Sequence, residues 1–273
     1  MNEFTAGLAA QDAVLVTVES SQGSVPREAG AWMGVFAGAI AGTVGGGHLE
    51  LQAIEEARRR LAGGSGEPVL HYPLGPSLGQ CCGGVVNLRF ERVTAGDAAS
   101  LNNRLAPALC EVALFGGGHV GRALAAALGP LPFAVRWIDS RDEIFPETLQ
   151  RNVQCEHSDP VQAAVADLAP GSHVLIMSFS HAEDLEVVAA CLKRQREAND
   201  LRFIGLIGSK TKWATFRHRL EERGFSKPEL AQVTCPIGLA GIQGKQPEVI
   251  AVSVAAQLLQ VRAWEAPGKS VHS

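Results

Sequence analysis

A glycine-rich segment with two adjacent thiols, Gly79-Gln80-Cys81-Cys82-Gly83-Gly84, carries the most unusual chemistry of the chain. Glycines expose backbone N–H groups, allow close approach of a ligand, and can lower the pKa of a thiol by presenting those groups to the thiolate. Thiolates are soft metal ligands and can carry sulfur as persulfides. Adjacent Cα atoms lie about 3.8 Å apart, below the usual disulfide range of about 4.4–6.8 Å, so we expect Cys81 and Cys82 not to bridge each other. The alternative is a tight turn with an incidentally buried Cys pair.

A second segment, Gly116-Gly117-Gly118-His119-Val120-Gly121, has the spacing of a dinucleotide fingerprint and is followed by Asp139, 23 positions after Gly116. We expect Gly116 to allow the tight turn, Gly118 to let the backbone approach a pyrophosphate, and Gly121 to let helix and strand pack closely. Asp139 would accept a hydrogen bond from a ribose hydroxyl, which favours NAD over NADP, although the nearby Arg141 weakens that preference. The alternative is a Rossmann-like domain whose site is vestigial or holds another ligand.

Two more loops lie in the first part of the chain. Residues 42–50 (GTVGGGHLE) combine a strand end, three glycines and a helix start, which indicates either an anion site or tight strand–helix packing. Residues 24–30 (SVPREAG) form a loop with a fixed turn and one arginine, Arg27.

Basic side chains follow Ser209, which lies at the end of a predicted strand. Lys210, Lys212, Arg217 and Arg219 could reach an anion or form a solvated helix face. The chain has no Gly-x-Ser-x-Gly elbow, His-Glu-x-x-His or Walker sequence, and we assign no catalytic residue.

The elements that must position these residues differ between the two halves. In the second half, strands alternate with helices of ten or more residues, which predicts a parallel, doubly wound sheet. The expected strands are 112–115, 133–138, 173–177 and 203–207, and the expected helices are 119–128, 160–168, 180–196, 210–223 and one from 247. The helix at 180 begins with a capping box, and the last helix has an apolar stripe of Val249, Val252, Ala256 and Leu259 that we expect to face the core.

The first half mixes short strands with one helix. Its expected strands are 12–19, 32–36, 39–44, 69–72 and 85–89, with a helix at about 49–61. The sequence therefore predicts an α/β protein: a smaller N-terminal α+β domain at 1–95, a linker at 96–108, and a Rossmann-like C-terminal domain with a doubly wound parallel sheet at 109–273.

Composition limits the classes of partner. The chain has 273 residues with 46% hydrophobic and 19% charged side chains, which is typical of a folded globular protein. Its net charge is −4 with 5% aromatic residues, which argues against nucleic-acid binding. Without a visible signal peptide or an apolar run of about 18 residues, we expect a cytoplasmic protein and no membrane contact. Six cysteines without a Cys-x-x-Cys pair argue against structural zinc.

Six motifs together resemble the XdhC/CoxI family of xanthine dehydrogenase accessory proteins, from about Ser20 to Leu259. They are, in order, SxxGSxPRxxG from Ser20, GTVGGGHxE from Gly42, GQCCGG from Gly79, GGGHVGR from Gly116, GLIGS from Gly205 and CPIGL from Cys235. Each motif is weak alone, but six in this order are specific.

The resemblance implies a non-catalytic assembly factor, typically a dimer. Such proteins bind the molybdenum cofactor (molybdopterin), support its sulfuration by a cysteine desulfurase, and deliver it to the molybdenum-binding subunit of apo-xanthine dehydrogenase. The cofactor is carried rather than used. Cys82 looks like the family's recurrent thiol and is the expected metal ligand. The other expected cofactor-binding residues are Arg27, Glu50, Gln80, Cys81, Gly116, Gly118, Gly121 and Asp139.

Two other functions stay open at this point. The Gly116–Gly121 fingerprint would suit an NAD(P)-dependent oxidoreductase, but no acid–base set accompanies it. The two thiols would suit a nucleotide or redox sensor. Hydride transfer would favour the oxidoreductase, and a change in partner binding when Cys82 is oxidised would favour the sensor.

Overall fold

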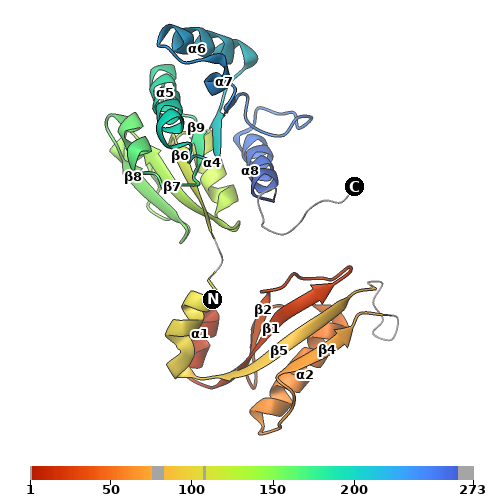
Figure 1. Ribbon diagram of the computed structural model, residues 1–273. Helices are drawn as coiled ribbons and strands as arrows, with labels where there is room; N and C mark the ends of the chain where they lie inside the picture. Colours follow the sequence, from red (N-terminus) through yellow and green to blue (C-terminus); the bar gives the residue numbers. More distant parts are fainter. Residues whose placement is uncertain (1, 76–82, 107–108, 264–273) are drawn as a thin grey trace. The chain divides into compact units, whose positions relative to one another are not determined.

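The computed structural model describes residues 2–75, 83–106 and 109–263. The chain divides into two compact units, residues 1–107 and residues 108–273 (Figure 1). No helix within the described ranges is long and apolar enough to cross a membrane.

The first unit is built on a five-stranded antiparallel sheet in the order β3-β2-β1-β5-β4. Its strands are β1 (Ala13–Gln22), β2 (Trp32–Val35), β3 (Ile40–Gly42), β4 (Val69–Pro73) and β5 (Val85–Val93). Its α-helices are α1 (Asn2–Leu8), α2 (Gly47–Leu61) and α3 (Ala98–Arg104), and a short 3-10 helix, η2 (Ala95–Asp97), precedes α3.

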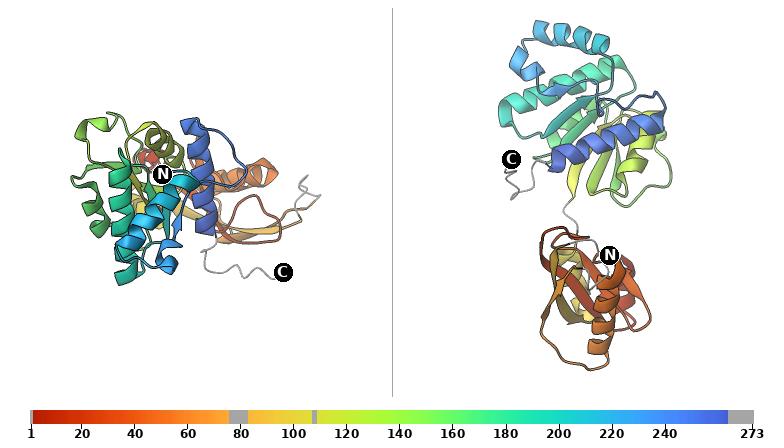
Figure 2. Two further views of the ribbon diagram at one scale, coloured as in Figure 1. Left: turned by 90° about the horizontal axis from the view of Figure 1, so that it is seen from above. Right: turned by 90° about the vertical axis from the view of Figure 1, so that its right-hand side faces the viewer.

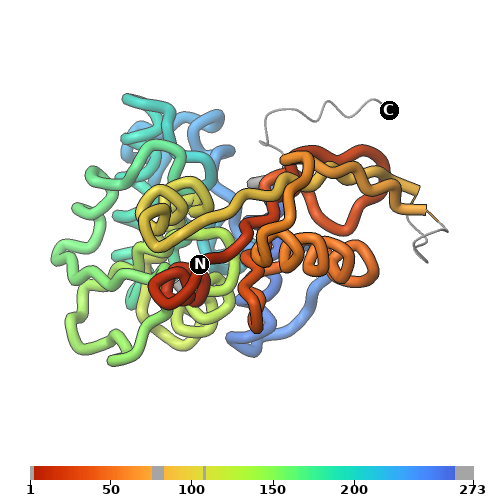
Figure 3. Tube along the Cα trace, turned by 90° about the horizontal axis from the view of Figure 1, so that it is seen from below, coloured from red at the N-terminus to blue at the C-terminus, as the bar shows by residue number. Residues whose placement is uncertain are grey.

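Alternation along β1 buries both faces of this sheet. Val14 and Val16 point to a core shared with Leu49 of α2, whereas Leu15 points to a second core formed with Phe4 of α1. Successive side chains of a strand lie on opposite faces, so helices can cover both. The two helices of the second core, α1 and α3, lie side by side (Figure 3).

The structure places α3 inside the segment for which the sequence predicted a linker at 96–108. Leu101 is 2% exposed in the core with α1, and Leu105 packs against the same core. These two leucines are four residues apart, so they share one helix face. The described part of this segment therefore belongs to the first unit, because its few apolar residues are spaced to pack on the sheet.

The second unit contains a six-stranded parallel sheet in the order β8-β7-β6-β9-β10-β11. Its strands are β6 (Cys110–Phe115), β7 (Phe133–Asp139), β8 (Val153–His157), β9 (His173–Ile176), β10 (Phe203–Leu206) and β11 (Val233–Thr234). Counted from β6, this is the 3-2-1-4-5-6 order of Rossmann folds. The predicted fold class, a Rossmann-like sheet with a smaller N-terminal α+β unit, is confirmed.

Helices cover both faces of the parallel sheet (Figure 2). One face carries α4 (His119–Leu128) and α8 (Pro247–Ala263). The other carries the 3-10 helix η4 (Val161–Asp167), α5 (His181–Ala198), α6 (Lys210–Glu222) and α7 (Lys227–Leu230). A further 3-10 helix, η3 (Asp142–Ile144), follows β7.

The sequence predictions did not include α1, β8, α7 and β11, and two of the elements that they did include differ in detail. The segment expected as an α-helix from Pro160 is the 3-10 helix η4, with Pro160 as its N-cap residue. The predicted core stripe of α8 is wrong at Val252, which is 61% exposed, whereas Leu259 packs against the core as expected and Val254 and Leu258, outside the stripe, are fully buried. The apolar residues of α8 lie on nearly all sides of the helix, so their spacing does not identify the face that meets the sheet.

We predict that Leu101→Ala destabilises the first unit by about 2–4 kcal/mol, because it leaves a cavity between α3 and the sheet. Hydrogen exchange of the full-length chain should show lost amide protection in β1 and β5. The control is Leu51→Ala on α2, whose side chain is 60% exposed and whose truncation should change little. Equal effects of the two substitutions would contradict the packing of α3.

Candidate functional site

The glycine turn of the second unit follows β6. The order of the strands in the sheet reverses at this point, between β6 and β9. Ligands of open α/β sheets bind outside the carboxyl ends of the strands at such a switch point. Gly116 has a φ of 124°, and an added Cβ would overlap the carbonyl oxygen of Met177, just after β9. A Cβ on Gly121 would overlap the carbonyl oxygen of Gly116, so strand, turn and helix approach too closely for any side chain there.

Gly118 differs from these two glycines. It is the N-cap residue of α4 with a φ of −69° and, being a glycine, it offers no side-chain cap to the helix. An added Cβ would meet no described atom within 4 Å. The first amides of a helix lack partners inside the helix. The open backbone at Gly118 therefore fits the predicted approach of an anion, which stays a prediction.

The carboxylate of Asp139, which the sequence predicted to bind a ribose hydroxyl, is hydrogen-bonded to groups of the protein. It is 2% exposed and accepts hydrogen bonds from the Gly117 amide at 2.6 Å and from the amide and guanidinium of Arg141. Burial would raise the pKa of Asp139, but the hydrogen bonds from Arg141 and Gly117 outweigh it, and the net shift is downward. Asp139 therefore stays charged and holds the glycine turn in place.

A buried ion pair supports the loop after β9. Asp184, in the first turn of α5, accepts a hydrogen bond from the Ser178 amide at 2.7 Å and contacts Lys212 Nζ at 2.6 Å. Lys212 also donates to the Ile207 carbonyl oxygen at the end of β10. The sequence did not single out this pair, although its signal was available: an acid and a base each in the first turn of a helix that follows a strand. Ser180 caps α5 as predicted.

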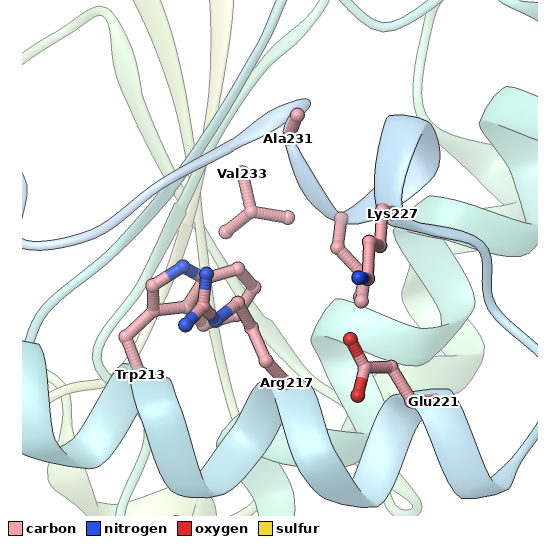
Figure 4. A pocket seen from close by; sticks show the side chains of 7 residues that line it. Trp213, Arg217, Glu221, Lys227, Ala231 and Val233 are labelled. Atoms are coloured by element: carbon pink, nitrogen blue, oxygen red, sulfur yellow. The ribbon is translucent and has the colours of Figure 1, made fainter.

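The basic residues of α6 therefore have different roles. Lys212 belongs to the ion pair. Arg217 lines a hollow of about 470 Å³ between α6 and α7, where it lies with Trp213 and Glu221 along one side of α6 (Figure 4). These three residues are four apart and so share a helix face.

In the first unit, the glycine loop between β3 and α2 binds a carboxylate of its own chain. Glu50 Oε2 accepts hydrogen bonds from the amides of Val44 at 3.0 Å and Gly46 at 3.1 Å, and from the Thr43 hydroxyl. Burial would raise the pKa of Glu50, but Thr43 and the loop amides lower it, and the net shift is downward. The loop is an anion-binding arrangement, as its sequence suggested, and Glu50 occupies it.

Three of the predicted motifs of this unit meet at one place. Gly45 lies against the ring of Pro26, since an added Cβ would be 2.6 Å from that ring. Gly84, just before β5, approaches the carbonyl oxygen of Ser24 so closely that an added Cβ would overlap it. The loop of residues 23–30, the loop of residues 42–50 and the end of the thiol segment are therefore neighbours.

The predicted site residues of this unit are placed unevenly. Arg27 is exposed beside Gly45, and Glu50 holds the neighbouring loop. Gln80, Cys81 and Cys82 lie outside the described residues. The segment that contains them joins β4 to β5, and the Leu74 amide donates to the Gly84 carbonyl oxygen at 2.8 Å where this segment starts and ends.

Three cysteines of the second unit are disfavoured as thiolates by burial. Burial raises the pKa of Cys155 and Cys235, and raises that of Cys191 to about 12. Within the described part of the chain, no group of three His, Cys, Asp or Glu side chains could hold a metal ion. Cys82, the predicted metal ligand, remains a prediction.

Comparison with known proteins identifies the family. Residues 112–258 match the family model described as the XdhC Rossmann domain, and residues 8–73 match the XdhC and CoxI family. The chain therefore belongs to the XdhC family, and the resemblance found in its motifs is confirmed.

Two relatives extend the comparison. The chain is 30% identical over 262 residues to the uncharacterized protein YqeB of Escherichia coli, with 93% of this chain and 44% of YqeB covered, so it spans less than half of that relative. A crystal structure from Bacillus halodurans, described as a xanthine dehydrogenase, has a TM-score of 0.78 over 98% of this chain and 97% of that one. At 20% identity, this match shows the same fold.

We predict that Gly116→Ala destabilises the second unit by about 2–4 kcal/mol, because it combines overlap with Met177 and a left-handed φ. Gly118→Ala should cost less than about 1 kcal/mol, because its Cβ points into open space. Thermal unfolding of the two variants measures the difference. Similar stability would show that the turn does not have this conformation.

We also predict that Glu50→Gln destabilises the first unit by about 1–2 kcal/mol at pH 7, because a neutral amide accepts weaker hydrogen bonds than a carboxylate. The pKa of Glu50 is lowered by folding, so its contribution is complete above its unfolded pKa of about 4.5 and is lost as the pH falls through the lower folded value. The free energy of unfolding of the first unit, obtained from hydrogen exchange between pH 3 and pH 7, should therefore change less with pH in the variant. Glu55→Gln, exposed on the same helix, is the control and should match the wild type.

Proposed function

We propose that this chain is an accessory protein of xanthine dehydrogenase that binds the molybdenum cofactor, supports its sulfuration and inserts it into the apo-enzyme. Family membership supports the accessory role. The observation that carries the cofactor proposal is the meeting of three loops in the first unit, where the segment of Cys81 and Cys82 starts and ends.

The residues at this meeting point suit a cargo with a soft metal and a phosphate. A thiolate of Cys82, with Cys81 beside it, would offer a soft sulfur ligand to the molybdenum, which the cofactor already holds through the sulfurs of a dithiolene. The exposed guanidinium of Arg27 would pair with the phosphate, since arginine matches phosphate geometry. Gln80 would add a polar contact from the same segment.

Glu50 acts indirectly in this proposal. Its Oε2 accepts hydrogen bonds from the amides of the loop at residues 43–46, and that loop supports Pro26 next to Arg27. Glu50 is therefore a positioning residue that fixes the loop from which Arg27 extends. The cofactor would be carried rather than used by this chain, since a separate cysteine desulfurase would carry out its sulfuration. The protein would therefore be an assembly factor rather than an enzyme.

The proposed partners follow from this role. A cysteine desulfurase would supply the sulfur for the cofactor that the chain holds. The chain would then deliver the cofactor to the molybdenum-binding subunit of xanthine dehydrogenase. We further propose that it acts in the cytoplasm as a homodimer.

A second candidate, an NAD(P)-dependent oxidoreductase, is favoured by one observation. The strand order and the conformations of Gly116 and Gly121 are those of a dinucleotide-binding Rossmann domain. The engagement of Asp139 by Arg141 disfavours it, because the carboxylate that should receive the ribose is already bound.

The test is to express the chain in a host that makes molybdopterin and to purify it without oxygen. We expect molybdenum and pterin near stoichiometric amounts in the wild type and strong depletion in Cys82→Ala, because the metal loses its thiolate. Elemental analysis measures molybdenum, and fluorescence after oxidation measures pterin.

The matched control is Cys155→Ala, which removes a half-buried thiol from β8 of the second unit. This variant should retain the cofactor. Pterin bound equally to all three proteins would remove Cys82 from the site. Pterin bound to none of them would contradict the proposed function.

A further inference from the structure

Two side-chain contacts cross the carboxyl edge of the parallel sheet above the glycine turn. The Arg141 guanidinium, after β7, lies over the Phe179 ring, after β9, at 4.3 Å from the ring centroid. The Ser140 hydroxyl donates to Glu183 Oε1 at 2.7 Å, between the same two segments. Strand β6 lies between β7 and β9 in the sheet (Figure 1). Both contacts therefore span the end of β6, where the Gly116 turn begins.

Both ends of this connection are anchored. Arg141 donates to Asp139 through its backbone amide and through two guanidinium nitrogens, all at 2.9 Å. The Phe179 amide donates to Glu183 Oε2 at 3.2 Å. Phe179 is 66% exposed, so burial does not hold its ring in place, and the guanidinium stacked on it is its described partner.

The same contacts fill the hydrogen-bonding capacity of Asp139. A carboxylate has about four lone-pair positions. Oδ1 accepts the Arg141 amide and Nε, and Oδ2 accepts the Gly117 amide and another guanidinium nitrogen of Arg141. A ribose diol approaching this carboxylate would therefore find no free acceptor.

A dinucleotide in a Rossmann domain lies across this edge, with its pyrophosphate on the glycine turn and its ribose on the acid after the second strand. Here the path is crossed by Arg141 and Phe179, and the acid is saturated. We infer that Arg141 and Phe179 form a bar that excludes nicotinamide dinucleotides from the crevice of the second unit. The inference concerns this unit alone and does not depend on the accessory role.

The experiment is a fluorescence titration of the full-length chain with NADH and, separately, with NADPH. The wild type should bind NADH weakly. Arg141→Ala combined with Phe179→Ala should bind NADH about tenfold tighter or more, because Asp139 becomes free to accept the ribose diol. NADPH should gain much less, because the freed carboxylate repels the 2′-phosphate.

The matched control is Arg196→Ala. Arg196 also stacks on a phenylalanine, Phe225, and pairs with a carboxylate, Glu229, but it lies at the end of α5 away from the turn. The affinity of the Arg196→Ala variant for NADH should equal that of the wild type. Thermal unfolding confirms that each variant is folded.

Two results would overturn the inference. One is a folded double variant whose NADH affinity equals that of the wild type, and the other is an equal gain in affinity for NADH and NADPH. If variants of Arg141 do not fold, Phe179→Ala alone decides. It removes the ring from the path of the dinucleotide but leaves Asp139 bound to Arg141, so the affinities for NADH and NADPH should both rise weakly. Unchanged affinities would refute the inference.

Discussion

The Asp139 carboxylate accepts a hydrogen bond from the Gly117 amide and is held on its other sides by Arg141. This buried charge fixes the glycine turn against the end of β7, and Arg141 in turn reaches Phe179 beyond β9. Three strand ends of the parallel sheet are thus tied together by one charged group. A neutral residue at position 139 would leave the Gly117 amide and the Arg141 guanidinium without their acceptor, so the geometry of the whole edge depends on this group.

The first unit uses a carboxylate in the same way. Glu50 satisfies the amides of a glycine-rich loop whose sequence indicated either an anion site or tight strand–helix packing. In both units, the loop is ordered before any ligand arrives, because an internal acid takes the hydrogen bonds. The proposed function therefore assigns the contacts to an external ligand to the exposed Arg27 and to the segment of Cys81 and Cys82.

Much of the fold followed from local patterns. The alternation of apolar strands with amphipathic helices predicted the parallel sheet, and Ser180 marked the start of α5. The predictions failed where local patterns are ambiguous. Nearly every side of α8 is apolar, so Val252 was assigned to the core although it is exposed. The residues of α3 are mostly small and polar, and only Leu101 and Leu105 reveal that it packs.

The sequence by itself determined the family and the two-part organisation of its motifs, because these depend on residue types and their spacing. The tertiary structure decided what the charged residues do. Asp139 and Glu50 were both candidate ligand-binding residues, and whether a carboxylate meets a ligand or a neighbouring amide depends on distances of about 3 Å between loops. Those distances are set by how strands far apart in the sequence pair and how the helices pack on them, which residue spacing does not specify.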